Sequence, residues 1–95
     1  MVLFKGSSGE HTVRFVKKTE SFVGQATIKF FTANSERSFL PPKLPNRRIE
    51  VVGDSISCGF GNLANDIKDK FMASTEDATQ TYWYLAAEEL KAEGV

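Results

Sequence analysis

The sequence predicts an α/β protein in which residues 47–95 open a parallel-sheet domain and residues 1–40 are the tail of a preceding β-sandwich. Two segments of the first half alternate with a period of two, and a buried strand followed by a loop and a helix is indicated for the second half. Charge divides in the same way, with seven basic and three acidic residues in 1–46 against five and nine in 47–95. This split favours two structural units over one uniform domain.

Residues 11–17 and 25–31 are rich in β-branched and aromatic side chains, and we expect two half-buried antiparallel strands there. Val13 and Phe15 share a face with His11, so we expect a partly buried strand histidine rather than a ligand. Since an isolated hairpin is marginal in water, the two strands indicate the end of a larger, jelly-roll-like module.

The three prolines of the chain all fall within residues 41–46, which predicts a semi-rigid linker between the two units. Upstream, the start of the chain is too short for a secretory signal, and no apolar run approaches the ~20 residues of a membrane helix. Either the protein stays inside the cell or its true amino terminus lies further upstream, and we favour the second because residues 1–40 have the pattern of the tail of a larger β domain. The parent protein is then expected to be secreted or extracellular.

The second half begins with nearly continuous β-branched residues at 49–52, as in a strand buried on both faces of a parallel sheet. Residues 62–74 are mixed and polar, which predicts a loop. Residues 79–93 have a helical period, with one apolar stripe formed by Tyr82, Leu85, Ala86 and Leu90. We expect Glu88 to pair with Lys91 and the helix to stop at Gly94. A parallel sheet needs further strands after this crossover, so the second half is the opening of a domain.

Gly53, Asp54 and Ser55 directly follow the predicted strand, where open α/β sheets place reacting groups. A serine in a tight turn exposes its hydroxyl, and backbone N–H groups there stabilise developing negative charge. Gly53 and Gly59 are predicted to be the structural glycines of this turn. Because serine alone is a weak nucleophile, it needs a neighbouring base, usually histidine.

The block Arg47-Arg-Ile-Glu-Val-Val-Gly-Asp-Ser-Ile-Ser-Cys-Gly-Phe-Gly-Asn62 closely resembles the first motif of the GDSL, or SGNH, hydrolases. Three further features resemble carbohydrate esterase family two in particular. They are the proline-rich linker, the segment Thr75-Glu-Asp77 followed by Thr81-Tyr82, and the upstream β segment. The resemblance runs from about residue 10 onward. It implies a jelly-roll-like module joined to an SGNH α/β/α domain that removes acetyl groups from plant-wall polysaccharides.

By this resemblance Ser55 matches the family nucleophile, and its backbone N–H matches one oxyanion donor. Asp54 matches the motif acid, which we interpret as an orienting hydrogen-bond group. The family's other oxyanion donors and its Asp-x-x-His would follow Val95, so we expect the 95-residue chain alone to be inactive. His11 precedes the nucleophile and lies in the other unit, so it is not assigned as the base. Phe60 replaces the tyrosine that is frequent in the family.

Two other function classes stay open: a non-catalytic carbohydrate-binding or interaction module, and a nucleotide-binding fragment suggested by the G-x-G-x-x-A spacing of residues 59–64. The second is disfavoured because six residues separate that spacing from the strand and no second strand is predicted. Balanced charge gives no footprint for nucleic acid, and neither a metal site nor a cofactor is expected. The expected partner is an acetylated carbohydrate; no oligomeric state is predicted.

Simpler interpretations also apply to individual side chains. Cys58 is expected to be a small packing residue. Core packing is favoured for Trp83 over a sugar contact. Glu76 and Asp77 precede the helix, and the attraction of carboxylates to its positive end explains them without a catalytic role.

Overall fold

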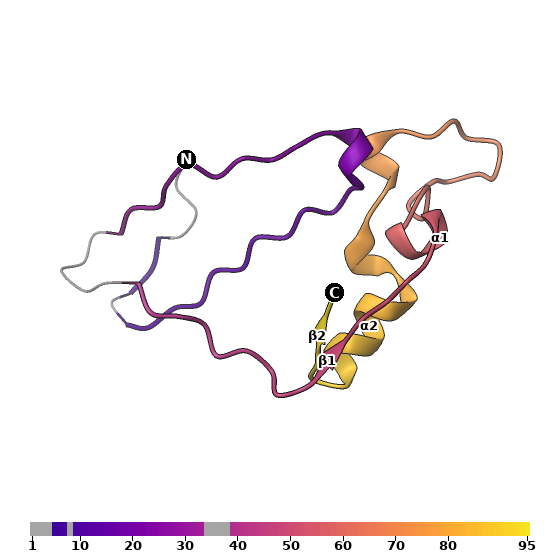
Figure 1. The fold of residues 1–95 in the computed structure, drawn as a ribbon. Coiled ribbons are helices and arrows are strands. Elements are labelled where there is room, and N and C mark those ends of the chain that lie inside the picture. The colour runs from indigo at the N-terminus through magenta and orange to yellow at the C-terminus, as the bar shows by residue number, and fades with distance from the viewer. Residues whose placement is uncertain (1–4, 8, 34–38) are drawn as a thin grey trace.

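The computed structural model describes residues 5–7, 9–33 and 39–95 and measures 52 × 32 × 22 Å. Its helices and strands gather in the second half of the chain (Figure 1). In chain order the elements are η1 (Ser21–Val23), β1 (Arg48–Ile49), α1 (Ser55–Cys58), η2 (Ala73–Thr75), η3 (Ala78–Gln80), α2 (Tyr82–Glu89) and β2 (Glu93–Gly94), where η denotes a 3-10 turn.

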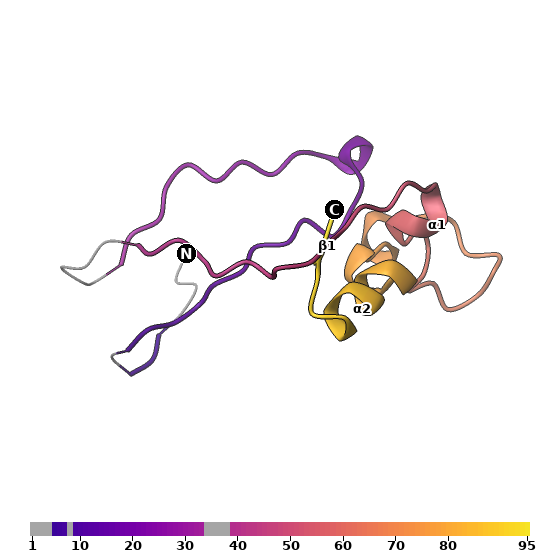
Figure 2. The same ribbon diagram turned by 60° about the horizontal axis from the view of Figure 1, so that its bottom comes forward.

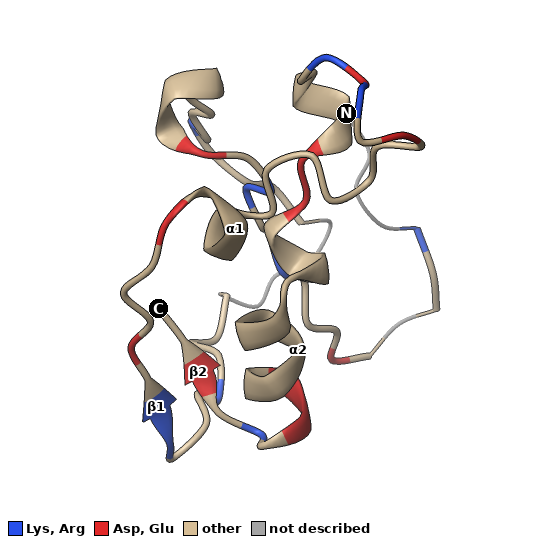
Figure 3. Ribbon diagram, turned by 90° about the vertical axis from the view of Figure 1, so that its right-hand side faces the viewer, with Lys and Arg blue, Asp and Glu red and all other residues tan. Residues whose placement is uncertain are grey.

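β1 and β2 pair in parallel, with Arg48 opposite Glu93 and Ile49 opposite Gly94. The side chains of the first pair approach to 3.8 Å; in the ribbon of Figure 3 the basic residue colours β1 blue and the acidic residue colours β2 red. Backbone bonds continue past the strand ends, because the Val51 N–H donates to the carbonyl of Val95 at 2.8 Å. A parallel strand–helix–strand unit is therefore present, where the sequence predicted a strand, a loop and a helix. The expectation that no second strand follows the helix is wrong, since β2 begins within the predicted helix.

The predicted helix over residues 79–93 is shorter in the structure, where α2 covers Tyr82–Glu89. Its end is a Schellman motif: Ala92 N–H donates to the Ala87 carbonyl at 2.8 Å, and Lys91 N–H donates to Glu88 at 3.0 Å. Lys91 takes the left-handed backbone conformation (φ 49°) that glycine usually supplies there. The helix thus stops before Gly94, which is free to enter β2.

The face of α2 that packs against the sheet also differs from the prediction. Tyr82, Leu85 and Leu90 of the expected stripe are 61%, 52% and 44% exposed, whereas Ala87 is buried. A Cβ on Gly94 would lie 2.7 Å from the Trp83 ring and 3.2 Å from Ala87, so these two side chains, one turn apart, cover β2. Among the described residues the sheet has two strands, which leaves the outer apolar stripe without a sheet to cover. Glu88 pairs with Arg14, at 2.7 Å, and not with Lys91.

Residues 11–17 and 25–31 run extended on one side of the α/β part (Figure 2), but neither forms a strand. The expected antiparallel pair is therefore wrong for this structure. The two segments meet through side chains: the rings of Phe15 and Phe31 lie 4.9 Å apart. Val13 stays 52% exposed and His11 is exposed too, against the expectation of half-buried strands. The apolar faces lack the further strands that a sandwich would pack against them, so the β-sandwich module stays a prediction.

The proline-rich segment 41–46 is exposed and free of regular structure, as a linker requires. Val52, in the predicted buried strand, is 93% exposed because β1 pairs on one side only. Residues 62–72 form a succession of turns and end in η2. Across the described residues, no helix has both the length and the apolar character needed to cross a membrane.

Candidate functional site

The Ser55 turn, which we define as residues 53–59, joins the end of the sheet to the helices (Figure 1). The Val51 N–H makes the last backbone hydrogen bond to the strand region of β2, at the Val95 carbonyl. The chain then bends through Gly53 into α1. Asp54 is the N-cap of α1: its Oδ1 accepts a hydrogen bond from the Ile56 N–H at 3.0 Å. This bond fixes the entry into the helix and places Ser55 at its first position. The hydrogen bond that Asp54 makes in this structure is therefore that of a helix N-cap.

Ser55 is exposed at the start of α1. Within the part of the chain that the structure describes, neither its hydroxyl nor its amide N–H has a hydrogen-bond partner. Its carbonyl is held instead, accepting from the Phe60 N–H at 2.9 Å and from Gly59. A fixed backbone with a free hydroxyl and a free amide offers a nucleophile and an oxyanion donor at one residue.

Both glycines predicted for the turn sit where a side chain would collide. A Cβ on Gly53 would lie 2.0 Å from the Ser57 hydroxyl oxygen and 2.6 Å from its Cβ. Gly59 takes the left-handed conformation (φ 83°), and a Cβ there would lie 2.7 Å from the Asp77 carbonyl oxygen. The first glycine is needed for close approach of the chain. The second is needed for backbone conformation as well.

The side of the turn away from Ser55 is supported by α2. The Ser57 hydroxyl shares a 2.8 Å hydrogen bond with the Tyr82 hydroxyl, and the Ser57 carbonyl accepts from the Trp83 indole at 2.7 Å. Trp83 therefore packs between the turn and β2, in a structural position. A cavity of about 210 Å³ lies beside this contact; its lining includes Gly53, Ser57, Trp83 and Glu20, but not Ser55.

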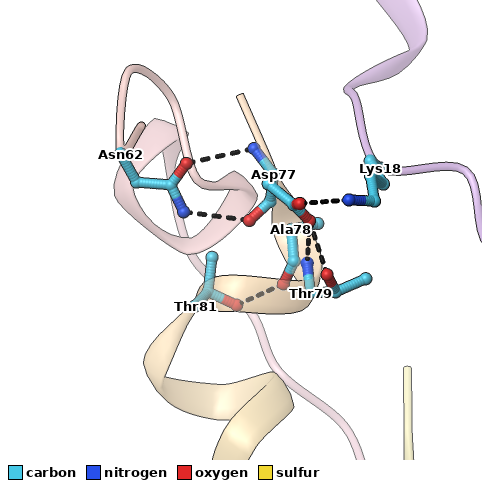
Figure 4. Close-up of polar contacts among 6 residues, drawn as sticks. All are labelled: Lys18, Asn62, Asp77, Ala78, Thr79 and Thr81. Atoms are coloured by element: carbon cyan, nitrogen blue, oxygen red, sulfur yellow. Dashed lines mark hydrogen bonds and ion pairs between the residues drawn. The ribbon is translucent and has the colours of Figure 1, made fainter. Parts of the chain in front are cut away.

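Asp77 is the centre of a buried polar cluster beside the turn (Figure 4). It is 3% exposed; its Oδ1 accepts from the Thr79 N–H at 2.9 Å and from the Thr79 hydroxyl at 2.6 Å. Its other carboxylate oxygen pairs with the ammonium of Lys18. The Asn62 side chain brackets the Asp77 backbone, accepting from its N–H at 3.0 Å and donating to its carbonyl at 2.9 Å. The expectation that this carboxylate acts through the helix end is thus incomplete, because it also joins Lys18 to Thr79, while the Asp77 backbone binds Asn62.

Glu76 is equally buried, at 3% exposed. Its Oε1 accepts a hydrogen bond from the Glu20 backbone N–H at 2.6 Å. Among the described residues its Oε2 is the buried side-chain oxygen that has no partner. The pair of acidic residues before α2 therefore faces the first half of the chain, not the solvent.

The lowered pKa of the Asp77 carboxyl predicts that the free energy of unfolding decreases at acidic pH. The hydrogen bond from Lys18, followed by those from Thr79, lowers the pKa of Asp77 below its ordinary 3.8. A lowered folded-state pKa stabilises the fold above the unfolded-state value, and this contribution is lost as the pH falls through the folded-state pKa. We expect the free energy of unfolding to decrease below about pH 4, and to decrease less steeply in Asp77→Asn. Denaturant unfolding of both proteins from pH 7 to pH 2 measures this; equal acid slopes would contradict it.

Cys58 and His11, which were considered in the sequence analysis, make no hydrogen bond with the Ser55 hydroxyl among the described residues. Burial, followed by the carboxylate of Glu20, raises the pKa of Cys58 above its ordinary 9.0, so the thiol stays protonated near neutral pH. The imidazole of His11 bonds to the Ser7 carbonyl at 2.9 Å, far along the chain from Ser55. The described residues hold no group of three or more His, Cys, Asp or Glu side chains that suits a metal ion.

Lys18 and Asn62 were not predicted as site residues. Lys18 follows Lys17 in the sequence, and its pairing with Asp77 over 59 residues leaves no local periodic signal. Asn62 ends the recognised motif, which is the signal that could have indicated its role. Its two bonds to the Asp77 backbone depend on how the loop folds back.

No family model matches the chain. It is 34% identical over 89 residues to an acetylxylan esterase / glucomannan deacetylase of Cellvibrio japonicus, covering 92% of this chain and 24% of that protein. It is 30% identical over 86 residues to the cellulase/esterase CelE of Acetivibrio thermocellus, covering 90% of this chain and 11% of that protein. The chain thus spans a quarter or less of the relatives it matches.

A solved structure is also similar, that of a family two carbohydrate esterase from Clostridium thermocellum in complex with cellohexaose. The TM-score is 0.56 at 32% identity, over 59% of this chain and 17% of that one. Fold, motif and sequence identity agree. Over the part of those proteins that it spans, the chain resembles the carbohydrate esterases, and family two in particular.

Proposed function

We propose that this chain carries the nucleophile of a serine esterase that removes acetyl groups from polysaccharides. The observation that carries the proposal is the state of Ser55: an exposed residue, on the turn after β1, whose hydroxyl and amide N–H have no hydrogen-bond partner among the residues that the structure describes. Reacting groups of open α/β sheets lie at such strand ends. The glycines that the turn requires keep its backbone close to Ser57 and Asp77.

In the proposed reaction the Ser55 oxygen attacks the acetyl carbonyl carbon while a base removes the hydroxyl proton. The Ser55 N–H donates to the developing oxyanion. Collapse of this intermediate breaks the ester bond, and the sugar hydroxyl leaves with the proton from the base. Water then attacks the acetyl-serine and releases acetate. The base is expected to be a histidine outside this chain, together with the glycine and asparagine that complete the oxyanion hole in the SGNH family.

The substrate class rests on one of the similar proteins, which is named acetylxylan esterase / glucomannan deacetylase. This mechanism uses a hydroxyl, backbone N–H groups and an imidazole, and so needs no cofactor. Because polysaccharides of this kind lie outside the cell, we propose that the protein acts as a secreted or extracellular enzyme. The preceding segment is proposed to be the end of a β-sandwich, joined through the linker 41–46.

Acetate release distinguishes this proposal from a carbohydrate-binding module. We expect the full-length protein to release acetate from acetylated xylan or glucomannan, and the 95-residue chain to release none. Enzymatic determination of acetate, with binding to the same polysaccharide measured in parallel, is the test. Binding without acetate release by the full-length protein would favour the binding module.

A further inference from the structure

Residues 18–20 belong to the first half of the chain and contact the loop before α2, in the second half, at three points. The Lys18 ammonium pairs with Asp77, the Lys18 carbonyl accepts from the Ala78 N–H at 2.9 Å, and the Glu20 N–H donates to Glu76. The partners lie 56 to 60 positions apart. Both carboxylates are 3% exposed, so this clasp, as we call residues 18–20 with 76–78, is a buried contact.

From the clasp, a continuous set of contacts reaches Ser55. The Asp77 backbone is bracketed by the Asn62 side chain, and the Asn62 N–H donates to the Gly59 carbonyl at 3.1 Å. Gly59 packs directly on the Asp77 carbonyl, and its own N–H donates to the carbonyl of Ser55. These contacts form a path by which a shift of Asp77 would reach the end of α1 and the residue that begins it.

An aromatic stack makes a second connection between the same segments. The Phe22 ring, in η1, lies 6.0 Å from the Phe71 ring, which stacks on Phe60 at 4.0 Å and 10°. Phe60 in turn donates its N–H to the carbonyl of Ser55 at 2.9 Å. Polar and aromatic contacts thus both run from residues 18–23 to the Ser55 backbone.

We propose that Lys18 is a positioning residue for Ser55, and that the segment before the linker is a working part of the esterase site. This inference rests on the proposed function. Lys18 does not touch the reacting atoms. It acts through Asp77, whose buried carboxylate keeps only the Thr79 donors once the ammonium is removed.

Arg14 provides a matched control. Its ion pair with Glu88, at 2.7 Å, also joins the first half of the chain to the second. Arg14 contacts Glu88 and the Tyr84 ring, both on α2, and among the described residues it makes no hydrogen bond or ion pair with the Ser55 turn. The two cations are similarly exposed, with 58% of the Lys18 side chain and 60% of the Arg14 side chain accessible. The partner carboxylates differ, with 4% of the Asp77 side chain and 52% of the Glu88 side chain accessible, so the rates of the variants are compared per folded molecule.

The experiment compares Lys18→Met, Lys18→Arg and Arg14→Met in the full-length protein at a temperature at which each is folded. We measure kcat and KM for an aryl acetate, and the rate at which diethyl p-nitrophenyl phosphate modifies Ser55. In that modification the serine oxygen displaces p-nitrophenolate from phosphorus. We expect Lys18→Met to lower both kcat and the modification rate about tenfold to a hundredfold, as misplacement by about 1 Å does. KM should stay within about twofold, Lys18→Arg should recover most of the rate, and Arg14→Met should match the unsubstituted protein.

Equal rates for Lys18→Met and the unsubstituted protein would overturn the inference, as would equal losses in Lys18→Met and Arg14→Met. If Lys18→Met does not fold, the shorter polar variant Lys18→Gln is compared in the same way, and a rate per folded molecule equal to that of the unsubstituted protein overturns the inference. Failure of the proposed function has a different signature: the unsubstituted protein would then neither hydrolyse the acetate nor be modified at Ser55.

Discussion

Replacement of Ser55 by alanine is expected to lower acetyl-ester hydrolysis by the full-length protein about ten-thousand-fold or more, the usual loss when a serine nucleophile is removed. The substitution removes the exposed hydroxyl, which has no hydrogen-bond partner among the described residues, so the fold loses no contact. We therefore expect a large loss of kcat with an unchanged unfolding midpoint. Steady-state kinetics together with thermal unfolding measure both quantities.

Ser57→Ala is the matched control, because the two serines are two positions apart on the same short helix. The Ser57 hydroxyl bonds to Tyr82 at 2.8 Å, so its removal should cost about 1 kcal/mol of stability. Turnover should fall far less than in Ser55→Ala. A Ser55→Ala protein that keeps its activity, or a Ser57→Ala protein that loses as much, would contradict the assignment of the nucleophile.

The second large effect is on stability. Gly59→Ala places a Cβ 2.7 Å from the Asp77 carbonyl oxygen, at a backbone conformation that side chains disfavour. Backbone atoms cannot swing aside as a flexible side chain does, so the turn or the Asp77 loop must shift. We expect a loss of about 2–4 kcal/mol in the free energy of unfolding. Denaturant unfolding measures this loss.

Gly61→Ala separates crowding from backbone strain. Gly61 also has a positive φ, 67°, but a Cβ there meets open space. Only the conformational cost of about 1 kcal/mol should appear. Equal losses at the two positions would show that contact between Gly59 and the Asp77 carbonyl does not determine the stability of the turn.

The local features of the site were predictable from the sequence because they depend on neighbouring residues. A β-branched run followed by Gly-Asp-Ser predicts a strand and a tight turn, whereas the short helix α1 that begins at Ser55 was not predicted. Asp54 caps its own helix, and Gly53 and Gly59 occupy the positions that the turn demands. Parallel pairing was also predictable, because the strand and helix patterns leave few other topologies.

The features that the sequence did not predict depend on distant partners. Residues 11–17 have the composition of a strand, but pairing needs neighbouring strands that these residues do not have in this structure. The helix stripe at Tyr82, Leu85 and Leu90 has the correct period, yet the sheet covers the face of Trp83 and Ala87. The clasp joins Lys18 to Asp77 across 59 positions, and no local pattern encodes that contact.

Covalent trapping tests the central claim most directly. The full-length protein is incubated with diethyl p-nitrophenyl phosphate, digested, and mapped by peptide mass spectrometry. Attack by an activated hydroxyl on the turn after β1 predicts one modified peptide with the phosphoryl group on Ser55, and activity lost in proportion to the label. Modification at another residue together with loss of activity, or full labelling of Ser55 with activity retained, would contradict it.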